Sequence, residues 1–74
     1  MLGKLNVGEK ARVKNIANVD QLVKRRLLDF GILEGAEVCV KCLMPFGGPI
    51  MVESSGQWIA IRRKEAFRIE VEKI

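Results

Sequence analysis

The residues of this 74-residue chain that could take part in chemistry are 2 cysteines, 13 lysines and arginines, and 9 aspartates and glutamates. Histidine and tyrosine are absent, which removes two common general acid and base side chains. The adjacent residues Ser54 and Ser55 have no neighbouring base that could activate a nucleophile. We therefore expect no catalytic site and no cofactor, and we interpret the chain as a binding protein rather than an enzyme.

Cys39 and Cys42 have the C-x-x-C spacing, which on a loop or at the start of a helix indicates redox or metal chemistry. Here the spacing lies within Ala36–Leu43, a segment whose composition predicts a strand with Val38, Val40 and Cys42 on one face. Side chains three residues apart in a strand point to opposite faces, so we expect the two thiols to face apart. Two ligands also fall short of a four-ligand zinc site. We predict structural cysteines and no metal site; a metal-sensing alternative would require metal binding that is lost on Cys→Ser substitution.

Arg26 is the most unusual charged residue, because it lies in the middle of an apolar helical face within the segment Leu22–Gly35. The other side chains on that face are those of Val19, Leu22, Val23 and Phe30. An unpaired buried guanidinium is costly, so Arg26 must reach hydrogen-bond acceptors. We predict that Arg26 is a structural residue that donates to loop carbonyls or to a carboxylate such as that of Asp29.

The start of this helix, its end and the turn that follows it each have a residue typical of that position. Asn18 or Asp20 caps its start, and Gly31 ends it in a left-handed conformation. Gly35 then turns the chain into the next strand. We assign Gly31 and Gly35 structural roles for this reason.

Short strands make up most of the remaining chain. Alternation of apolar and polar residues predicts strands at Lys10–Asn15, Glu37–Leu43, Ile50–Glu53, Gln57–Arg62 and Phe67–Val71. An extended arm is expected at Leu2–Leu5, and a helical turn at Arg62–Ala66.

These elements predict one mainly β domain that covers residues 1–74, with one short helix between the first and second strands. About five short strands in so small a chain favour a closed or nearly closed barrel, which hides the edges of its sheet.

Four residues are candidates for contact with a partner: Arg25, Leu28, Phe46 and Trp58. Arg25 and Leu28 lie off the apolar helical face, and Phe46 lies in a Gly/Pro-rich loop. Trp58 is expected to point to the opposite face of its strand from Ile59 and Ile61, which are the better core candidates. Exposed together, they would make a contact surface. The alternative is that Trp58 and Phe46 pack on each other and close one end of the barrel.

The formal net charge of +4 permits nucleic-acid binding as an alternative function, with Trp58 available for base stacking. Basic and acidic residues are interleaved, however, so we favour a mixed solvated surface and no nucleic-acid partner. No signal-peptide pattern is evident, and no apolar run approaches the roughly 20 residues of a membrane helix. We expect a cytoplasmic protein that does not insert into a membrane.

Five motifs along nearly the whole chain resemble the FeoA family. They are Arg26-Leu27-x-x-Phe30-Gly31-Ile32-x-x-Gly35, Val38-x-Val40, Pro49-Ile50-x-Val52, Ile59-Ala60-Ile61-Arg62 and Glu65-Ala66-x-x-Ile69-x-Val71. The resemblance implies an SH3-like barrel that acts in bacterial ferrous-iron uptake. It also implies a partner, the membrane transporter FeoB, whose cytoplasmic G-protein domain the family is expected to bind or regulate. A further hypothesis is that an exposed arginine, Arg25 or Arg62, acts as an arginine finger on that domain.

Overall fold

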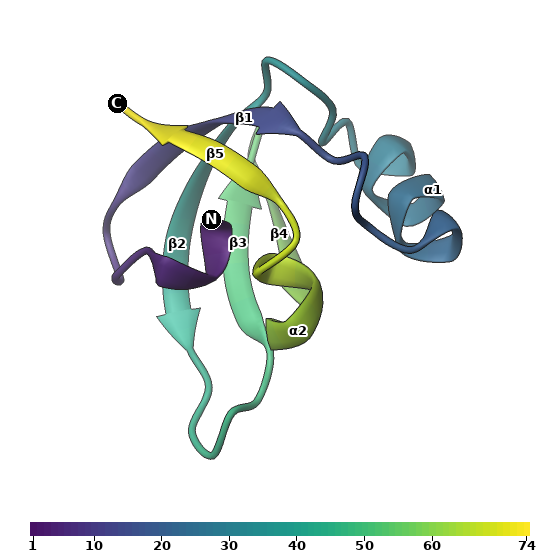
Figure 1. The fold of residues 1–74 in the computed structure, drawn as a ribbon. Helices are drawn as coiled ribbons and strands as arrows, with labels where there is room; N and C mark the ends of the chain where they lie inside the picture. Colours follow the sequence, from purple (N-terminus) through teal and green to yellow (C-terminus); the bar gives the residue numbers. More distant parts are fainter.

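The computed structural model describes residues 1–74 and contains five strands and three helical segments (Figure 1). Their order along the chain is η1 (Leu2–Lys4), β1 (Lys10–Asn15), α1 (Gln21–Asp29), β2 (Glu37–Leu43), β3 (Ile50–Ser54), β4 (Gln57–Ile61), α2 (Arg63–Ala66) and β5 (Glu70–Lys73). The predicted bounds of the first two strands are confirmed, and the third and fourth strands differ from their predicted bounds by one residue each.

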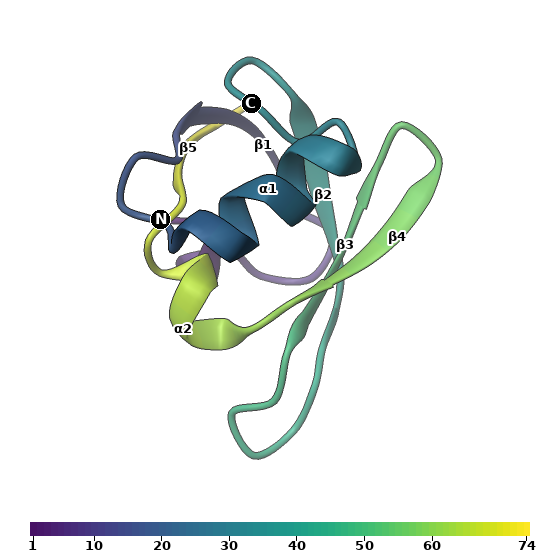
Figure 2. The same cartoon turned by 90° about the vertical axis from the view of Figure 1, so that its right-hand side faces the viewer.

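All strand pairs are antiparallel, in the order β4-β3-β2-β1-β5. This arrangement confirms a mainly β fold with a helix between the first two strands. The sheet curls strongly, but β4 and β5 remain its two edges (Figure 2). The barrel is therefore nearly closed rather than fully closed, and α2 connects β4 to β5 across the remaining opening.

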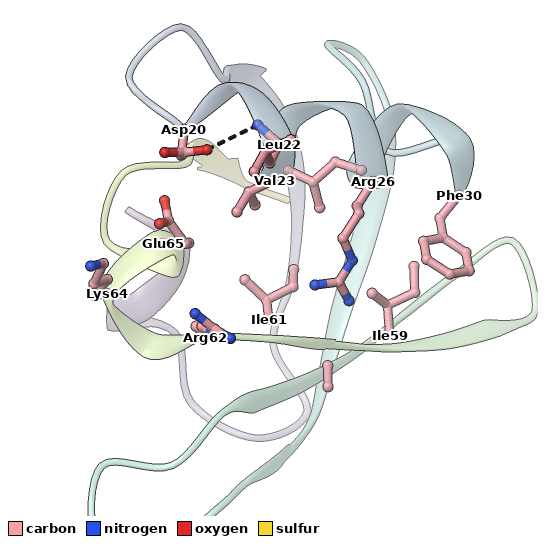
Figure 3. A pocket seen from close by; sticks show the side chains of 12 residues that line it. Asp20, Leu22, Val23, Arg26, Phe30, Ile59, Ile61, Arg62, Lys64 and Glu65 are labelled. Carbon is pink, nitrogen blue, oxygen red and sulfur yellow. Dashed lines mark hydrogen bonds between the residues drawn. The ribbon is translucent and has the colours of Figure 1, made fainter.

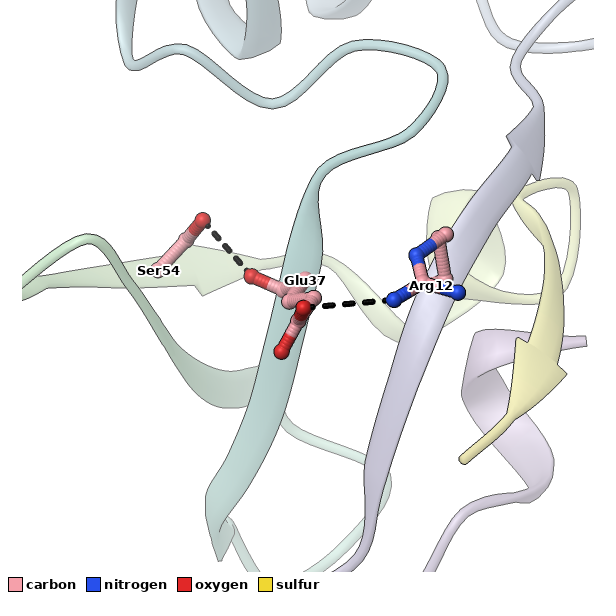
Figure 4. A network of polar contacts seen from close by, with 3 residues as sticks. All are labelled: Arg12, Glu37 and Ser54. Carbon is pink, nitrogen blue, oxygen red and sulfur yellow. Dashed lines mark hydrogen bonds and ion pairs between the residues drawn. The ribbon is translucent and has the colours of Figure 1, made fainter.

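The core is formed by 16 buried apolar residues, which come mainly from the inward positions of the strands. Its fully enclosed members include Leu2, Ile32, Ile50 and Ile69. Outside the core, Ser54 Oγ donates a 2.9 Å hydrogen bond to the Glu37 carbonyl, and the Glu37 carboxylate pairs with Arg12 at 3.3 Å (Figure 4). These contacts join the neighbouring strands β1, β2 and β3.

A bulge in β2 overturns the predicted placement of the cysteines. Cys39 pairs with Glu53 and Cys42 pairs with Met51, so Lys41 is the extra residue. Cross-strand partners project to the same face, and residues 51 and 53 share a face of β3. The two thiols therefore lie on the same face, not on opposite faces as predicted. Both cysteines are free.

Two segments near the termini also differ from prediction. Leu2–Lys4 forms the 3-10 helix η1 rather than an extended arm, and the Leu2 backbone N–H donates to the Ile69 carbonyl at 2.9 Å. The last strand begins at Glu70 rather than Phe67. Phe67 instead terminates α2, with its N–H donating to the Arg63 carbonyl.

Both ends of α1 are capped. Asp20 Oδ1 accepts a 2.9 Å hydrogen bond from the Leu22 N–H, as expected of an N-cap. At the other end Gly31 has a φ of 79°, and the N–H groups of Gly31 and Ile32 donate to the carbonyls of Leu28 and Leu27. This pair of bonds is the Schellman arrangement. Gly35, with a φ of 95°, makes the predicted turn into β2.

Candidate functional site

A groove of about 340 Å³ lies between α1 and the β4–α2 segment (Figure 3). It exists because α1 packs on the barrel through a narrow part of its surface. Leu27 is buried, at 2% exposure, and Val23 is half-buried, whereas Leu22 is 77% exposed. Of the predicted apolar face, Val19 is buried and Val23 packs against the core, so this part of the prediction is confirmed. Leu22 and Phe30 are exposed and line the groove instead, and Leu27 is an anchor that was not predicted.

The walls of the groove are largely apolar. α1 contributes Leu22, Val23, Leu27 and Phe30, and β4 contributes residues 59–61. Ile59 is itself buried in the core, so the floor of the groove is continuous with the barrel interior. Exposed apolar side chains beside a concave surface are typical of a binding site.

Arg26 extends from α1 into this groove, and its guanidinium lies over the Ile59–Ile61 segment of β4 in Figure 3. The residue is exposed, and its side chain makes no hydrogen bond or ion pair within the chain. The predicted hydrogen bonds from Arg26 to loop carbonyls or to the Asp29 carboxylate are therefore absent, and this prediction is wrong. Arg63 makes the type of bonds expected of Arg26: it donates to the carbonyls of Gly48 at 3.1 Å and Met44 at 3.0 Å.

Glu65 is the most unusual polar residue of the groove. It is only 5% exposed, and its Oε1 atom is buried without a hydrogen-bond partner. Figure 3 places its carboxyl on the side of α2 that faces α1, near Asp20 and Val23. Buried polar atoms are nearly always bonded, and Oε1 of Glu65 is an acceptor that no group of this chain satisfies.

Basic residues surround the opening of the same groove. Arg62 and Lys64 line it together with Arg26, and all three are exposed and free of ion pairs. The groove thus combines apolar walls, a basic rim and a buried carboxyl. This combination suits an extended, partly charged ligand more than a purely apolar one.

The four predicted contact residues do not form one surface. Arg25, Leu28, Phe46 and Trp58 are all exposed, but none lines the groove. Phe46 lies in the β2–β3 loop, whereas Trp58 pairs with Glu53 near the opposite end of β3. The alternative in which Phe46 and Trp58 pack on each other is therefore wrong.

The sequence did not predict that the groove-lining face of α1 is open to solvent or that Glu65 is buried. The first of these features has a recognisable pattern in the sequence. Leu22, Arg26 and Phe30 recur at intervals of four, and a charged residue within that apolar row indicates a face that is not fully buried. Glu65 left no such signal, because its burial depends on how α2 packs against α1.

No group of three or more His, Cys, Asp or Glu side chains is arranged to hold a metal ion. Glu9, in the turn before β1, lies outside the groove and has a pKa below its ordinary value. The cause is first the hydrogen bond from the Asn6 backbone N–H at 2.7 Å and then the contact with Lys73 Nζ at 2.6 Å. Both contacts favour the ionised carboxylate, and the contact with Lys73 also joins the turn to β5.

Comparison with known proteins gives a consistent result. Residues 1–73 match the family described as FeoA domain. The chain is 36% identical to the FeoA protein of Chlorobium tepidum, with a TM-score of 0.92 over 99% of this chain and 69% of that one. It is 32% identical to an iron uptake regulatory protein, FeoA, with a TM-score of 0.82 over 99% and 93% of the two chains.

A third similar structure is FeoA of Stenotrophomonas maltophilia, described as a prokaryotic SH3 domain protein and solved as a zinc complex. It is 28% identical, with a TM-score of 0.80 over 96% of this chain and 87% of that one. The predicted SH3-like barrel is confirmed by this match. A comparison with curated protein sequences gave no match.

Proposed function

The chain belongs to the FeoA family of ferrous-iron transport proteins, and from this premise we propose that it binds the cytoplasmic G-protein domain of a FeoB-type transporter. The observation that carries the proposal is the groove between α1 and β4, with its exposed apolar wall and unpaired charges. Such a surface is suited to binding a protein partner.

The remainder of the chain supports a role as an accessory protein. It has neither histidine nor tyrosine, and the groove contains no nucleophile beside a base. No helix is long and apolar enough to cross a membrane. Because the proposed partner domain is cytoplasmic, we propose that the protein acts in the cytoplasm by docking on the transporter rather than by catalysis or membrane insertion.

The docking proposal is tested by measuring binding to the purified cytoplasmic domain of the transporter, with GDP and with a non-hydrolysable GTP analogue. We expect saturable binding that is weakened by Leu22→Glu, because this change puts a charge on the apolar wall of the groove. Val7→Glu is the matched control, since Val7 is also exposed but lies outside the groove. Absence of binding in both nucleotide states would contradict the proposal.

The contact residues Arg25, Leu28, Phe46 and Trp58 remain candidates for further contacts outside the groove. They are exposed at separate places, so a partner would have to extend well beyond α1 to reach them all. Individual substitutions by serine, compared with Leu22→Glu in the same assay, show which of these places the partner covers.

A regulatory role for an arginine is a separate hypothesis. Arg25 and Arg62 are exposed and free of ion pairs, as an arginine finger must be before it meets a nucleotide. GTP turnover by the partner's G domain is then expected to rise with the wild-type protein and not with Arg25→Ala or Arg62→Ala. Equal turnover with all three proteins would rule out the arginine finger while leaving docking unaffected.

A further inference from the structure

We propose that the groove binds an extended peptide segment that adds as a strand to the free edge of β4 and places a lysine or arginine side chain against the Glu65 carboxyl. This inference rests on the proposed function for the source of the segment, which is the cytoplasmic part of the transporter. Three independent features of the chain support it: the edge of β4, the shape of the groove and the unpartnered carboxyl.

The edge of β4 presents unused backbone groups. β4 is an outer strand of the sheet, and the two-residue turn Ser55–Gly56, with φ values of 52° and 81°, sets the register of the hairpin. In such a hairpin alternate residues bond to the neighbouring strand, so the N–H and C=O groups of Trp58 and Ala60 point away from β3. No turn or loop hydrogen bond uses these groups. An added strand would satisfy them.

The groove lies directly beside this edge. Ala60 and its neighbours Ile59 and Ile61 form one wall, and Leu22 and Phe30 of α1 form the other (Figure 3). Successive side chains of a strand point to opposite faces, so every second side chain of an added segment would enter the space between β4 and α1. The exposed apolar surface of α1 would then be covered.

The Glu65 carboxyl indicates the charge that one side chain of the added peptide segment should carry. Its Oε1 atom is buried and unbonded, so a ligand with a suitable donor gains a hydrogen bond that the free protein lacks. A lysine or arginine suits this position best, because its aliphatic stem can lie along the apolar walls while its charged end meets a carboxylate. The groove therefore selects an extended segment in which a basic residue meets Glu65 and is flanked by apolar ones, with acidic residues where the segment passes the basic rim of Arg26, Arg62 and Lys64.

The first test uses short overlapping peptides that cover the cytoplasmic part of the transporter, with binding to the intact chain measured by fluorescence anisotropy. We expect one peptide with a basic residue to bind. Replacement of that residue by norleucine, or Glu65→Gln in the protein, should weaken binding roughly tenfold or more. The two changes together should cost little more than either alone, because they remove the same contact. Glu34→Gln is the control, since Glu34 is exposed and outside the groove.

The second test locates the bound peptide by amide hydrogen exchange. Strand addition should slow exchange at Trp58 and Ala60, whereas binding by side chains alone should not. Unchanged exchange at both amides, or equal affinity for the norleucine peptide, would overturn the inference.

The two proposals fail in distinguishable ways. If the intact cytoplasmic domain binds wild-type protein and Glu65→Gln equally well, and no peptide binds, docking stands and strand addition is wrong. If neither the domain nor any peptide binds, both proposals are wrong. Thermal unfolding of Glu65→Gln shows that any loss of binding does not come from loss of the fold.

Discussion

The Glu65 carboxyl combines burial with an unbonded oxygen, and this combination is expected to lower the stability of the free chain. Replacing Glu65 by methionine keeps the length of the side chain and removes the buried polar atoms. We expect Glu65→Met to raise the free energy of unfolding by about 1 kcal/mol, as measured by urea denaturation. Glu34→Met, at an exposed position, should change it by less than about 0.5 kcal/mol. A marked loss of stability in Glu65→Met would show that Glu65 serves the fold rather than a ligand.

Glu9 gives the protein a pH-dependent component of stability. Its pKa is lower in the folded chain than in the unfolded chain, chiefly because the Asn6 N–H stabilises the carboxylate and secondly because Lys73 does. Stability from such a group is present above the unfolded pKa and is lost as the pH falls through the folded pKa.

We therefore expect the melting temperature of the wild type to fall, relative to Glu9→Gln, as the pH is lowered below about 4.5, the ordinary value for this carboxyl. The difference between the two proteins should be constant from pH 6 to pH 7, where the carboxylate is ionised in both states. A difference that does not narrow in acid would contradict this assignment.

At the scale of elements, the end of α1 depends on the left-handed conformation of Gly31. A Cβ atom at this position would meet no other atom within 4 Å, so a substitution introduces backbone strain alone. We expect Gly31→Ala to cost about 1 kcal/mol of unfolding free energy. Gly31→Asn should recover much of this loss, because asparagine tolerates the left-handed region better. Urea titration of both variants tests this, and equal losses would point to a cause other than backbone strain.

The strands of this fold could be predicted from sequence because apolar alternation is a local signal. β1 and β2 occur at the predicted residues, and the Ser54–Gly56 hairpin was correctly placed. The bulge at Lys41 could not be predicted, because a residue is extra only relative to its pairing with the neighbouring strand. The sequence of β2 alone does not contain this pairing. One such residue reversed the predicted orientation of Cys42.

The groove was less predictable than the strands for a related reason. The helical wheel correctly grouped Leu22, Arg26 and Phe30, but it could not show whether that face meets the barrel or stands apart from it. Packing through Leu27 decided this, and packing depends on contacts between elements distant in sequence. The position of Arg26 among apolar residues was the local sign that the face is open to solvent.

At the scale of the whole molecule, the core is small, so each buried side chain contributes a large share of the free energy of unfolding. A chain of this length buries a modest fraction of its surface, and its total stability is expected near the low end of about 5–15 kcal/mol. The curled sheet leaves an opening between its edges, which α2 spans between β4 and β5 (Figure 1), and η1 packs against α2. The N-terminal residues are thus part of the fold and not a loose arm.

Leu2 is the residue that ties this N-terminal segment to the rest of the molecule. It is 1% exposed, belongs to the core cluster, and its N–H donates to the Ile69 carbonyl at 2.9 Å. We expect Leu2→Ala to lower the free energy of unfolding by about 2–5 kcal/mol, because it leaves a cavity where η1 meets α2. Val7→Ala, at an exposed position in the same part of the chain, should cost less than about 0.5 kcal/mol. Urea denaturation followed through Trp58 fluorescence measures both values, and equal costs would mean that η1 contributes little to closing the barrel.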